Sequence, residues 1–163
     1  MVVRSGDVAD SRLMARTLGT YRLEVVGSPS YFERAGLPST PEELAKHACL
    51  HHKYPTTGKV QRWPFVRRAT ADDVVMPMTG TASTIEALVA LAEHGVGLAC
   101  VPDFAVRRQV LDGSLRIILA ENIDHSGMFR AMWPSSRYLS PKVRVFVDFL
   151  AQHLFPEPQT RNG

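Results

Sequence analysis

The alternation of apolar and polar positions is clearest between residues 74 and 101. A short apolar run from Val74 to Met78 predicts a buried strand, and the small residues Thr79 to Ala82 predict a turn after it. A wide apolar stripe over residues 83–93 predicts a helix, and the run from Gly97 to Val101 predicts a second buried strand. With linkers this short, the segment is predicted to form a βαβ unit of a parallel sheet.

The start of this predicted helix is the first candidate for a binding site. Ser83 is followed three residues later by Glu86, which is the capping-box pattern, and Gly95 suits a left-handed C-terminal cap. Amide groups at a helix start lack partners within the helix and carry partial positive charge. Ser83, Thr84 and their backbone N–H groups could therefore hold a carboxylate or another polar ligand, while the alternative that Ser83 only caps its helix stays open.

Elsewhere the pattern predicts further alternating elements. Residues 13–18 are expected to be extended, Gly19 and Thr20 to turn, and residues 21–25 to form a half-exposed strand. The last helix is predicted from Ser140 onward by a long apolar stripe. The remaining predicted elements are short helices at 31–35 and from Thr40, strands at 63–66, 115–119 and 128–132, and a helix from Asp103 ended by Gly113. Alternating helices and strands predict an α/β fold with a mostly parallel sheet.

Composition narrows the function classes. The 163 residues are 45% hydrophobic, enough for one domain or two small lobes. The net charge is only +3, with basic pairs at Arg67-Arg68 and Arg107-Arg108, so no clustered basic face for nucleic acid is predicted. The sequence has neither the apolar region of a signal peptide nor a run of membrane-spanning length. We therefore expect a soluble, cytoplasmic protein without a membrane partner.

Neither metal nor cofactor chemistry is predicted. Cys49 and Cys100 lie far apart in apolar surroundings and are expected to be small buried residues in a reducing compartment. His47, His51 and His52 are close in sequence, but neighbouring residues of a strand point to opposite faces, so they are predicted to be surface residues and not a metal site.

Catalysis is not supported by the motifs. Residues 80–84 lack the final glycine of a nucleophile elbow, and the sequence contains neither phosphate-binding nor dinucleotide-binding glycine patterns. The Gly95-Val96-Gly97 segment follows a helix where a dinucleotide motif would precede one. The chain is therefore predicted not to be an enzyme; a small hydrolase or transferase would need a nucleophile with a base in reach.

Several of these pieces, taken in order, resemble the effector-binding domain of LysR-type transcriptional regulators. The similarity covers nearly the whole chain and keeps the family's motif order and rough spacing. Its motifs are Val3-Arg4-Ser5-Gly6, residues 13–18, residues 23–32 with Gly27-Ser28-Pro29-Ser30-Tyr31, the helix 83–93 with Gly95-Val96-Gly97-Leu98, the strand to Pro102, and residues 128–150 with Pro134-Ser135-Ser136-Arg137, Leu139-Ser140-Pro141 and Val143-Arg144-Val145-Phe146.

The resemblance implies a periplasmic-binding-protein-like fold of two α/β lobes joined by two crossing strands. Residues 1–26 and 127–155 would form lobe I with the crossing strands, residues 27–123 would form lobe II, and residues 156–163 a disordered tail. Lobe I would be incomplete, because the family's helix-turn-helix, its linker helix and the first part of lobe I would precede Met1. An incomplete lobe leaves a sheet edge and apolar surface that a partner chain could cover.

The resemblance also implies where an effector binds. Ser83 and Thr84 fall where many relatives carry Asn-Asp, and losing that carboxylate favours an anionic effector, so a carboxylate is the candidate ligand. Arg4 and Ser5 are candidates on the lobe I rim. The crossing strands would carry Val25, Val26, Phe129 and Arg130 as hinge residues, a group that the resemblance alone suggests.

The family also implies partners for the whole protein. We expect a homo-oligomer that reaches DNA only through a helix-turn-helix domain absent from this chain, with no cofactor. The alternative from another class is a solute-binding protein of a transport system, which would use the same cleft but would require an export signal.

Overall fold

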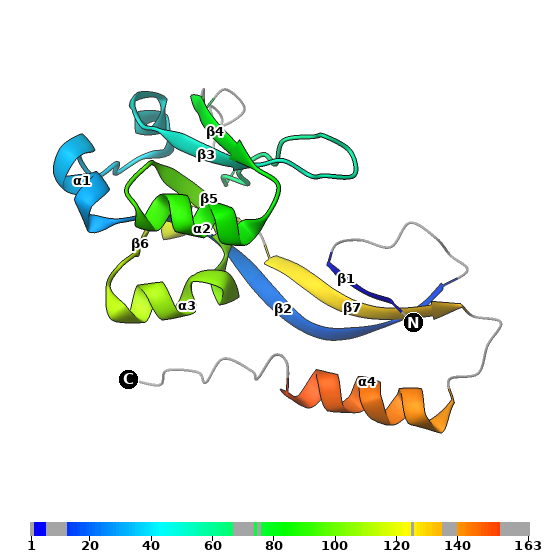
Figure 1. Cartoon of the computed structure of the whole chain (residues 1–163). Helices are drawn as coiled ribbons and strands as arrows, with labels where there is room; N and C mark the ends of the chain where they lie inside the picture. Colours follow the sequence, from blue (N-terminus) through cyan, green and yellow to red (C-terminus); the bar gives the residue numbers. More distant parts are fainter. Residues whose placement is uncertain are drawn as a thin grey trace. The chain divides into compact units, whose positions relative to one another are not determined.

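The computed structural model describes residues 2–5, 13–66, 74, 76–124, 126–134 and 140–153. The chain divides into two compact units (Figure 1). Unit 1 comprises Met1–Tyr21 and Ser126–Gly163, and unit 2 comprises Arg22–His125. The long strand β2 (Leu13–Gly27) contributes residues to both units.

Unit 2 is built on a mixed sheet. Strand β3 (Cys49–His52) lies between β4 (Met78–Ala82) and β5 (Leu98–Pro102) and is parallel to both. Strand β2 runs antiparallel to β5 and to β6 (Arg116–Ile118). The strand β4, helix α2 (Ile85–Glu93) and strand β5 therefore form the predicted βαβ unit, with β3 inserted between its two strands.

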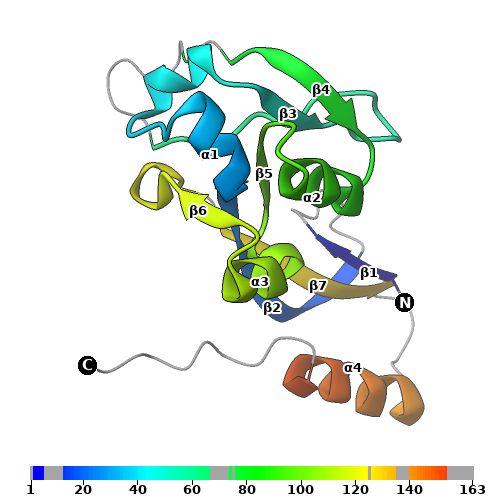
Figure 2. The same ribbon diagram turned by 60° about the vertical axis from the view of Figure 1, so that its left-hand side comes forward.

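The core of unit 2 lies between this sheet and two helices. Helices α2 and α3 (Asp103–Asp112) contribute apolar side chains to one buried cluster with the strands, as their positions in Figures 1 and 2 illustrate. The fully buried members of this cluster on the helices and strands include Val26, Leu50, Leu88, Ala99, Val101 and Val106. All five residues of β5 are buried, as expected for a strand in the middle of a sheet.

Helix α1 (Pro29–Ala35) follows β2, and a 3₁₀ helix, Pro41–Lys46, precedes β3. The Oγ of Ser28 caps α1 by accepting a hydrogen bond from the Tyr31 amide at 3.3 Å. The Arg34 guanidinium donates to the Gly95 carbonyl at 2.6 Å, which ties α1 to the chain after α2. Gly95 has φ of +71°, as predicted for the residue that ends the helix pattern.

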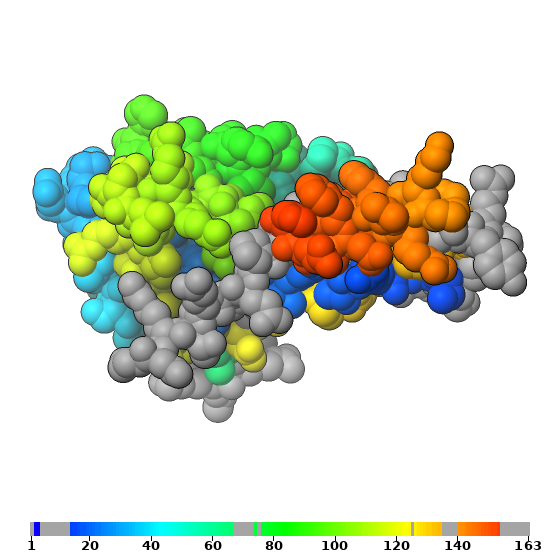
Figure 3. All heavy atoms as spheres, turned by 90° about the horizontal axis from the view of Figure 1, so that it is seen from below, coloured from blue at the N-terminus to red at the C-terminus, as the bar shows by residue number. Residues whose placement is uncertain are grey.

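The described residues of unit 1 form parts of three strands and one helix. Strand β7 (Ser126–Pro134) lies between β1 (Val2–Ser5) and β2 in the sheet, and β1 is antiparallel to β7. Helix α4 (Pro141–His153) packs on this sheet through Val147, which is buried with Leu18 and Ala131. Figure 3 shows α4, in orange and red, lying over the blue residues of β2.

Several sequence predictions about strands were wrong. The sheet is not mostly parallel, because β1–β7, β2–β5 and β2–β6 are antiparallel. Gly19 and Thr20 do not turn but continue β2, since both ends of that strand find partners in the sheet. The strand predicted at Val74–Met78 begins at Met78 and runs through the predicted turn, because Thr-Gly-Thr can form a short edge strand. Val75 lies outside the described residues.

Other predictions failed where tertiary contacts override local pattern. Residues 63–66 do not form a strand; Phe65 makes only an isolated bridge to Ile123. The segment from Thr40 forms a 3₁₀ helix whose Thr40 side chain makes no cap hydrogen bond. His47 and His51 are buried, at 7% and 5% exposure, and not on the surface as predicted. The predicted link 67–73 and tail 156–163 lie outside the described residues.

Candidate functional site

The carboxyl ends of the parallel strands meet at one edge of the unit 2 sheet. Strands β3, β4 and β5 end at His52, Ala82 and Pro102, and each parallel strand presents its last residues on the same edge. The candidates Ser83 and Thr84 directly follow β4 and are both exposed. Crevices at the carboxyl ends of parallel strands are a common place for ligands to bind.

Thr84, not Ser83, caps helix α2. The Thr84 Oγ1 accepts a hydrogen bond from the Ala87 amide at 3.3 Å, while the helix itself spans Ile85–Glu93. The prediction that Ser83 caps the helix was wrong because β4 continues through Ala82, so the helix begins one residue later. Ser83 therefore keeps its hydroxyl for other contacts, next to first-turn amides that have no partner within the helix.

His52 is a neighbour of Ser83 that sequence reasoning missed. Its Nε2 lies 3.2 Å from the Ser83 carbonyl oxygen, and this contact holds when Nε2 carries the proton. The Tyr54 ring lies 4.9 Å from the His52 ring in an edge-to-face arrangement. Parallel pairing of β3 with β4 brings His52 beside Ser83, and the pattern of a single strand does not reveal this contact.

The end of β5 carries negative charge instead. The Asp103 Oδ1 accepts hydrogen bonds from the amides of Phe104, at 2.9 Å, and Arg22, at 3.3 Å. The pKa of Glu24 is raised, chiefly by burial. The Arg22 charge opposes this rise, and the nearby Asp103 carboxylate adds to it. Each helix has one acidic residue in its first turn, Glu86 in α2 and Asp103 in α3, but Glu24 adds a further carboxylate beside Asp103. The start of α2 is therefore less unfavourable for an anion than the start of α3.

The other sequence candidates lie in both units. The β1–β7 register pairs Arg4 with Arg130 and Ser5 with Phe129, so the structure brings four predicted residues together in unit 1. Ser83 and Thr84 lie in unit 2. Val25 and Val26 are fully buried in β2 within unit 2, where they pair with Cys100 and Ala99 of β5. Both valines pack as core residues of unit 2, and their hinge role stays a prediction.

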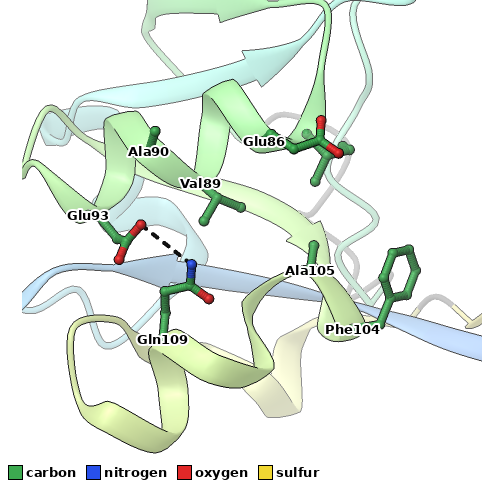
Figure 4. Close-up of a pocket in the computed structure, with 8 residues that line it drawn as sticks. Glu86, Val89, Ala90, Glu93, Phe104, Ala105 and Gln109 are labelled. Atoms are coloured by element: carbon green, nitrogen blue, oxygen red, sulfur yellow. Dashed lines mark hydrogen bonds between the residues drawn. The ribbon is translucent and has the colours of Figure 1, made fainter.

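A groove lies between helices α2 and α3 (Figure 4). This α2–α3 groove encloses about 390 Å³, and Phe104 and Glu86 project at one end of it. At the other end Gln109 donates to the Glu93 Oε2 at 3.4 Å. Its remaining lining residues are Ile85, Val89, Ala90 and Ala105. The sequence carried no signal for this groove, because it forms from two helices that pack side by side.

The buried cysteines and the described residues as a whole offer little for catalysis or metal binding. Both thiols are free, and burial raises the pKa of Cys49 and of Cys100 to about 12, so neither is a nucleophile near neutral pH. Among the described residues no cluster of three or more His, Cys, Asp or Glu could hold a metal ion. In the same part of the chain, no helix combines the length and apolar character needed to cross a bilayer.

The buried imidazole of His47 predicts a pH-dependent stability. Its Nδ1 lies 3.0 Å from the Tyr31 hydroxyl, and burial lowers the pKa of His47 while Glu43 opposes that shift. Because the unfolded chain binds this proton more readily than the folded chain, the free energy of unfolding should fall as pH drops through about 6.5, the ordinary histidine value. Urea unfolding at pH 5 to 8 measures this slope.

The control for this prediction is His47→Gln, which is neutral at every pH and retains a hydrogen-bonding group. Its unfolding free energy should depend less steeply on pH below about 6.5 than that of the parent. Equal slopes for the two proteins would contradict the prediction and assign the pH dependence to other groups.

The chain resembles known proteins throughout. The family model described as LysR substrate binding domain matches residues 1–155. The HTH-type transcriptional regulator CrgA of Neisseria meningitidis is 36% identical over 155 residues, covering 94% of this chain and 51% of CrgA. The chain thus spans about half the length of this curated relative.

Solved structures agree with this assignment. The CrgA regulatory domain superimposes with a TM-score of 0.79 at 34% identity, covering 93% of this chain and 74% of that one. Full-length AphB, a virulence activator of Vibrio cholerae, superimposes with a TM-score of 0.71 at 25% identity, and the match covers 91% of this chain and 50% of AphB. Such regulatory domains have the periplasmic-binding-protein-like fold, which confirms the predicted fold class. The relatives are regulators, so neither an enzyme nor a transport protein is favoured. The chain belongs to the LysR substrate-binding domain family.

Proposed function

We propose that residues 1–163 supply the ligand-sensing part of a LysR-type transcriptional regulator, with a small carboxylate as effector. The observation that carries this proposal is the family membership of residues 1–155 together with the exposed start of α2. Ser83 contributes an exposed hydroxyl there, and the first-turn amides of α2 contribute partial positive charge. Thr84 shapes this end of the helix through its cap.

Unit 1 carries the other candidate contacts of this proposal. The register of β1 with β7 pairs Arg4 with Arg130. In this proposal Arg4 would supply a positive charge to the effector rim, and Ser5, the next residue of β1, would supply a hydroxyl.

In this proposal β2 and β7, which are neighbours in the sheet, are the two crossing strands that contain the hinge. In this proposal residues 1–26 and 127–155 belong to lobe I and residues 27–123 to lobe II. Val25, Val26, Phe129 and Arg130 lie on the crossing strands. Effector binding would favour one of two arrangements of the lobes. In the whole protein this shift would change how the subunits of the oligomer pack. The whole protein would act in the cytoplasm as a homo-oligomer bound to DNA through a separate helix-turn-helix domain.

A thermal-shift screen of small aliphatic and aromatic carboxylates against residues 1–163 tests the ligand class. A true effector should raise the melting temperature with concentration, by mass action on the folded state. The Ser83→Ala variant should need roughly tenfold more ligand for the same rise in melting temperature, as expected for a lost hydrogen bond to a charged group.

Two matched variants separate binding from helix capping. Thr84→Ser keeps the capping oxygen and should leave basal stability unchanged, whereas Thr84→Ala should lower it by about 1 kcal/mol with or without ligand. If no carboxylate shifts the melting temperature, or if Ser83→Ala responds like the parent, the proposed effector class is wrong. A helix-turn-helix encoded in frame upstream would support the regulator, and an export signal there would support a solute-binding protein.

A further inference from the structure

Residues 61–66 of unit 2 begin beside the candidate binding site. The Gln61 amide donates a hydrogen bond to the His52 carbonyl oxygen at 2.8 Å. The His52 side chain in turn lies 3.2 Å from the Ser83 carbonyl oxygen. A second tie comes from the Lys53 amide, which donates at 2.8 Å to the carbonyl of the residue before Ser83. The start of this 61–66 segment is therefore held by the strand ends that lead into the candidate site.

The 61–66 segment ends against the part of the chain that leads into β7. The Val66 amide donates to the Asn122 carbonyl oxygen at 2.7 Å. The Asp124 amide donates to the Pro64 carbonyl oxygen at 3.0 Å, and an isolated antiparallel bridge lies between these two hydrogen bonds. Because β7 begins two residues after Asp124, we call these contacts the β7 clamp.

Trp63 fixes the middle of the segment to the sheet. Its side chain is only 5% exposed, and its ring centroid lies 5.7 Å from that of the buried His51 in β3 and 6.2 Å from that of Phe65. Gln61 and Val66 are five residues apart, a distance of at most about 18 Å for an extended chain. A segment this short and anchored at its middle has little slack, so a displacement at one end is transmitted to the other.

The chain on the other side of the clamp is strained. Among the described residues, Leu119 is the one non-glycine residue with a positive φ, at +54°. The 3₁₀ helix Ala120–Asn122 follows it and ends in the β7 clamp. A left-handed conformation is unfavourable for leucine because its β-carbon crowds the next carbonyl oxygen, and such strain persists only where surrounding contacts hold it. Opening the clamp would relieve this strain, which gives the segment a second accessible state.

We infer that the β7 clamp opens and closes with the occupancy of the effector site, and that Trp63 is the positioning residue that couples the two. The inference rests on the proposed function, in which Ser83 contacts the effector and β7 is a crossing strand. An effector held by Ser83 changes the carbonyl that His52 contacts, and the Gln61 hydrogen bond passes this change to the 61–66 segment. Effector-bound and effector-free forms then differ in the population of the closed clamp.

A purely structural role of Trp63 makes a different prediction. Removing a packed ring would loosen both ends of the segment, but one end would not then respond to a change at the other. A continuous series of contacts is not itself evidence of coupling, so coupling has to be measured between the two ends. Double-variant comparisons measure it directly.

Amide hydrogen exchange of residues 1–163, followed by NMR without ligand, tests the inference. His52→Ala removes the side-chain contact with Ser83 and should accelerate exchange of the Val66 and Asp124 amides by at least roughly fivefold, because the clamp opens more often. His94→Ala is the matched control. Its ring nitrogen Nδ1 also contacts a backbone carbonyl, that of Ala90 at 2.8 Å, but at the far end of α2, so this change should leave both amides at the parent rate.

Variants of Trp63 assign the coupling to this residue. In a Trp63→Ala background, adding His52→Ala should cause no further acceleration at Asp124. Trp63→Phe keeps an aromatic ring against His51 and should restore the response to His52→Ala. Circular dichroism verifies that each variant is folded, and Trp63→Leu replaces Trp63→Ala if the alanine variant does not fold.

Two outcomes would overturn the inference. The first is that His52→Ala changes exchange at Asp124 no more than His94→Ala does. The second is that His52→Ala accelerates this exchange equally with and without the Trp63 ring, so that the coupling does not depend on it. No ligand enters these measurements. An effector screen without a hit would therefore contradict the proposed function alone, and an unresponsive clamp would contradict this inference alone.

Discussion

Replacing Gly97 with alanine should lower the free energy of unfolding by about 3 kcal/mol. A β-carbon at Gly97 would lie 2.6 Å from the Ala48 carbonyl oxygen and 3.1 Å from its carbonyl carbon. The same oxygen accepts a hydrogen bond from the Leu98 amide at 2.8 Å, where β5 begins beside β3. Because the obstructing atoms are backbone, the methyl group can be accommodated only by separating two strands of the buried sheet.

Urea unfolding followed by circular dichroism measures this effect, with Gly80→Ala as the control. Gly80 lies within β4, but its added β-carbon would meet only the end of the Leu50 side chain, at 3.2 Å, which can move. We expect Gly80→Ala to be markedly less destabilising. If the two variants unfold at the same urea concentration, the close approach at Gly97 is not a constraint on the sheet.

Replacing Gly127 with alanine should destabilise unit 1 by about 1–3 kcal/mol through overpacking. The Tyr21 ring covers Gly127, and an added β-carbon would overlap with the ring atoms. Tyr21 also packs against Phe129, with ring centroids 5.1 Å apart. Accommodating the methyl group requires the ring to leave, which removes its packing against β7.

A double-mutant cycle tests this mechanism. Tyr21→Ala should be destabilising alone, but adding Gly127→Ala to it should cause little further loss, because the obstructing ring is gone. The double variant should be more stable than the sum of the two single effects predicts, by a coupling energy on the order of 1–3 kcal/mol. Ser126→Ala, at the exposed neighbouring position of β7, should leave stability unchanged. Additive effects of the Tyr21 and Gly127 changes would contradict the proposed contact.

Local sequence signals predicted the elements whose stability is mostly local or fully buried. The apolar spacing of α4 predicted its position, and the structure places it at Pro141–His153. Gly95 and Gly113 follow the ends of α2 and α3 and have φ of +71° and +81°, a conformation that glycine adopts readily. The uninterrupted apolar run before Pro102 predicted the central strand β5, because a strand covered on both faces needs no polar alternation.

Predictions failed where a distant part of the chain decided the outcome. Gly19 and Thr20 carry turn propensity, yet they continue β2 because neighbouring strands pair with it. His47 and His51 were expected at the surface, but the Tyr31 hydroxyl supplies a partner for one and the Trp63 ring, 5.7 Å away, covers the other. The His52 contact with the Ser83 carbonyl likewise joins residues 31 positions apart, which single-strand patterns do not reveal.

The sequence by itself therefore determined the helix and strand types of the longest apolar segments, the family and the candidate start of α2. Only the tertiary structure decided that the sheet is mixed, that Thr84 caps α2 instead of Ser83, and that Val3, Phe146 and Phe149 are exposed. The physical reason is that periodicity reports which face of an element is apolar. Which other segment covers that face depends on strand order and register, and these are set by contacts between residues far apart in the chain.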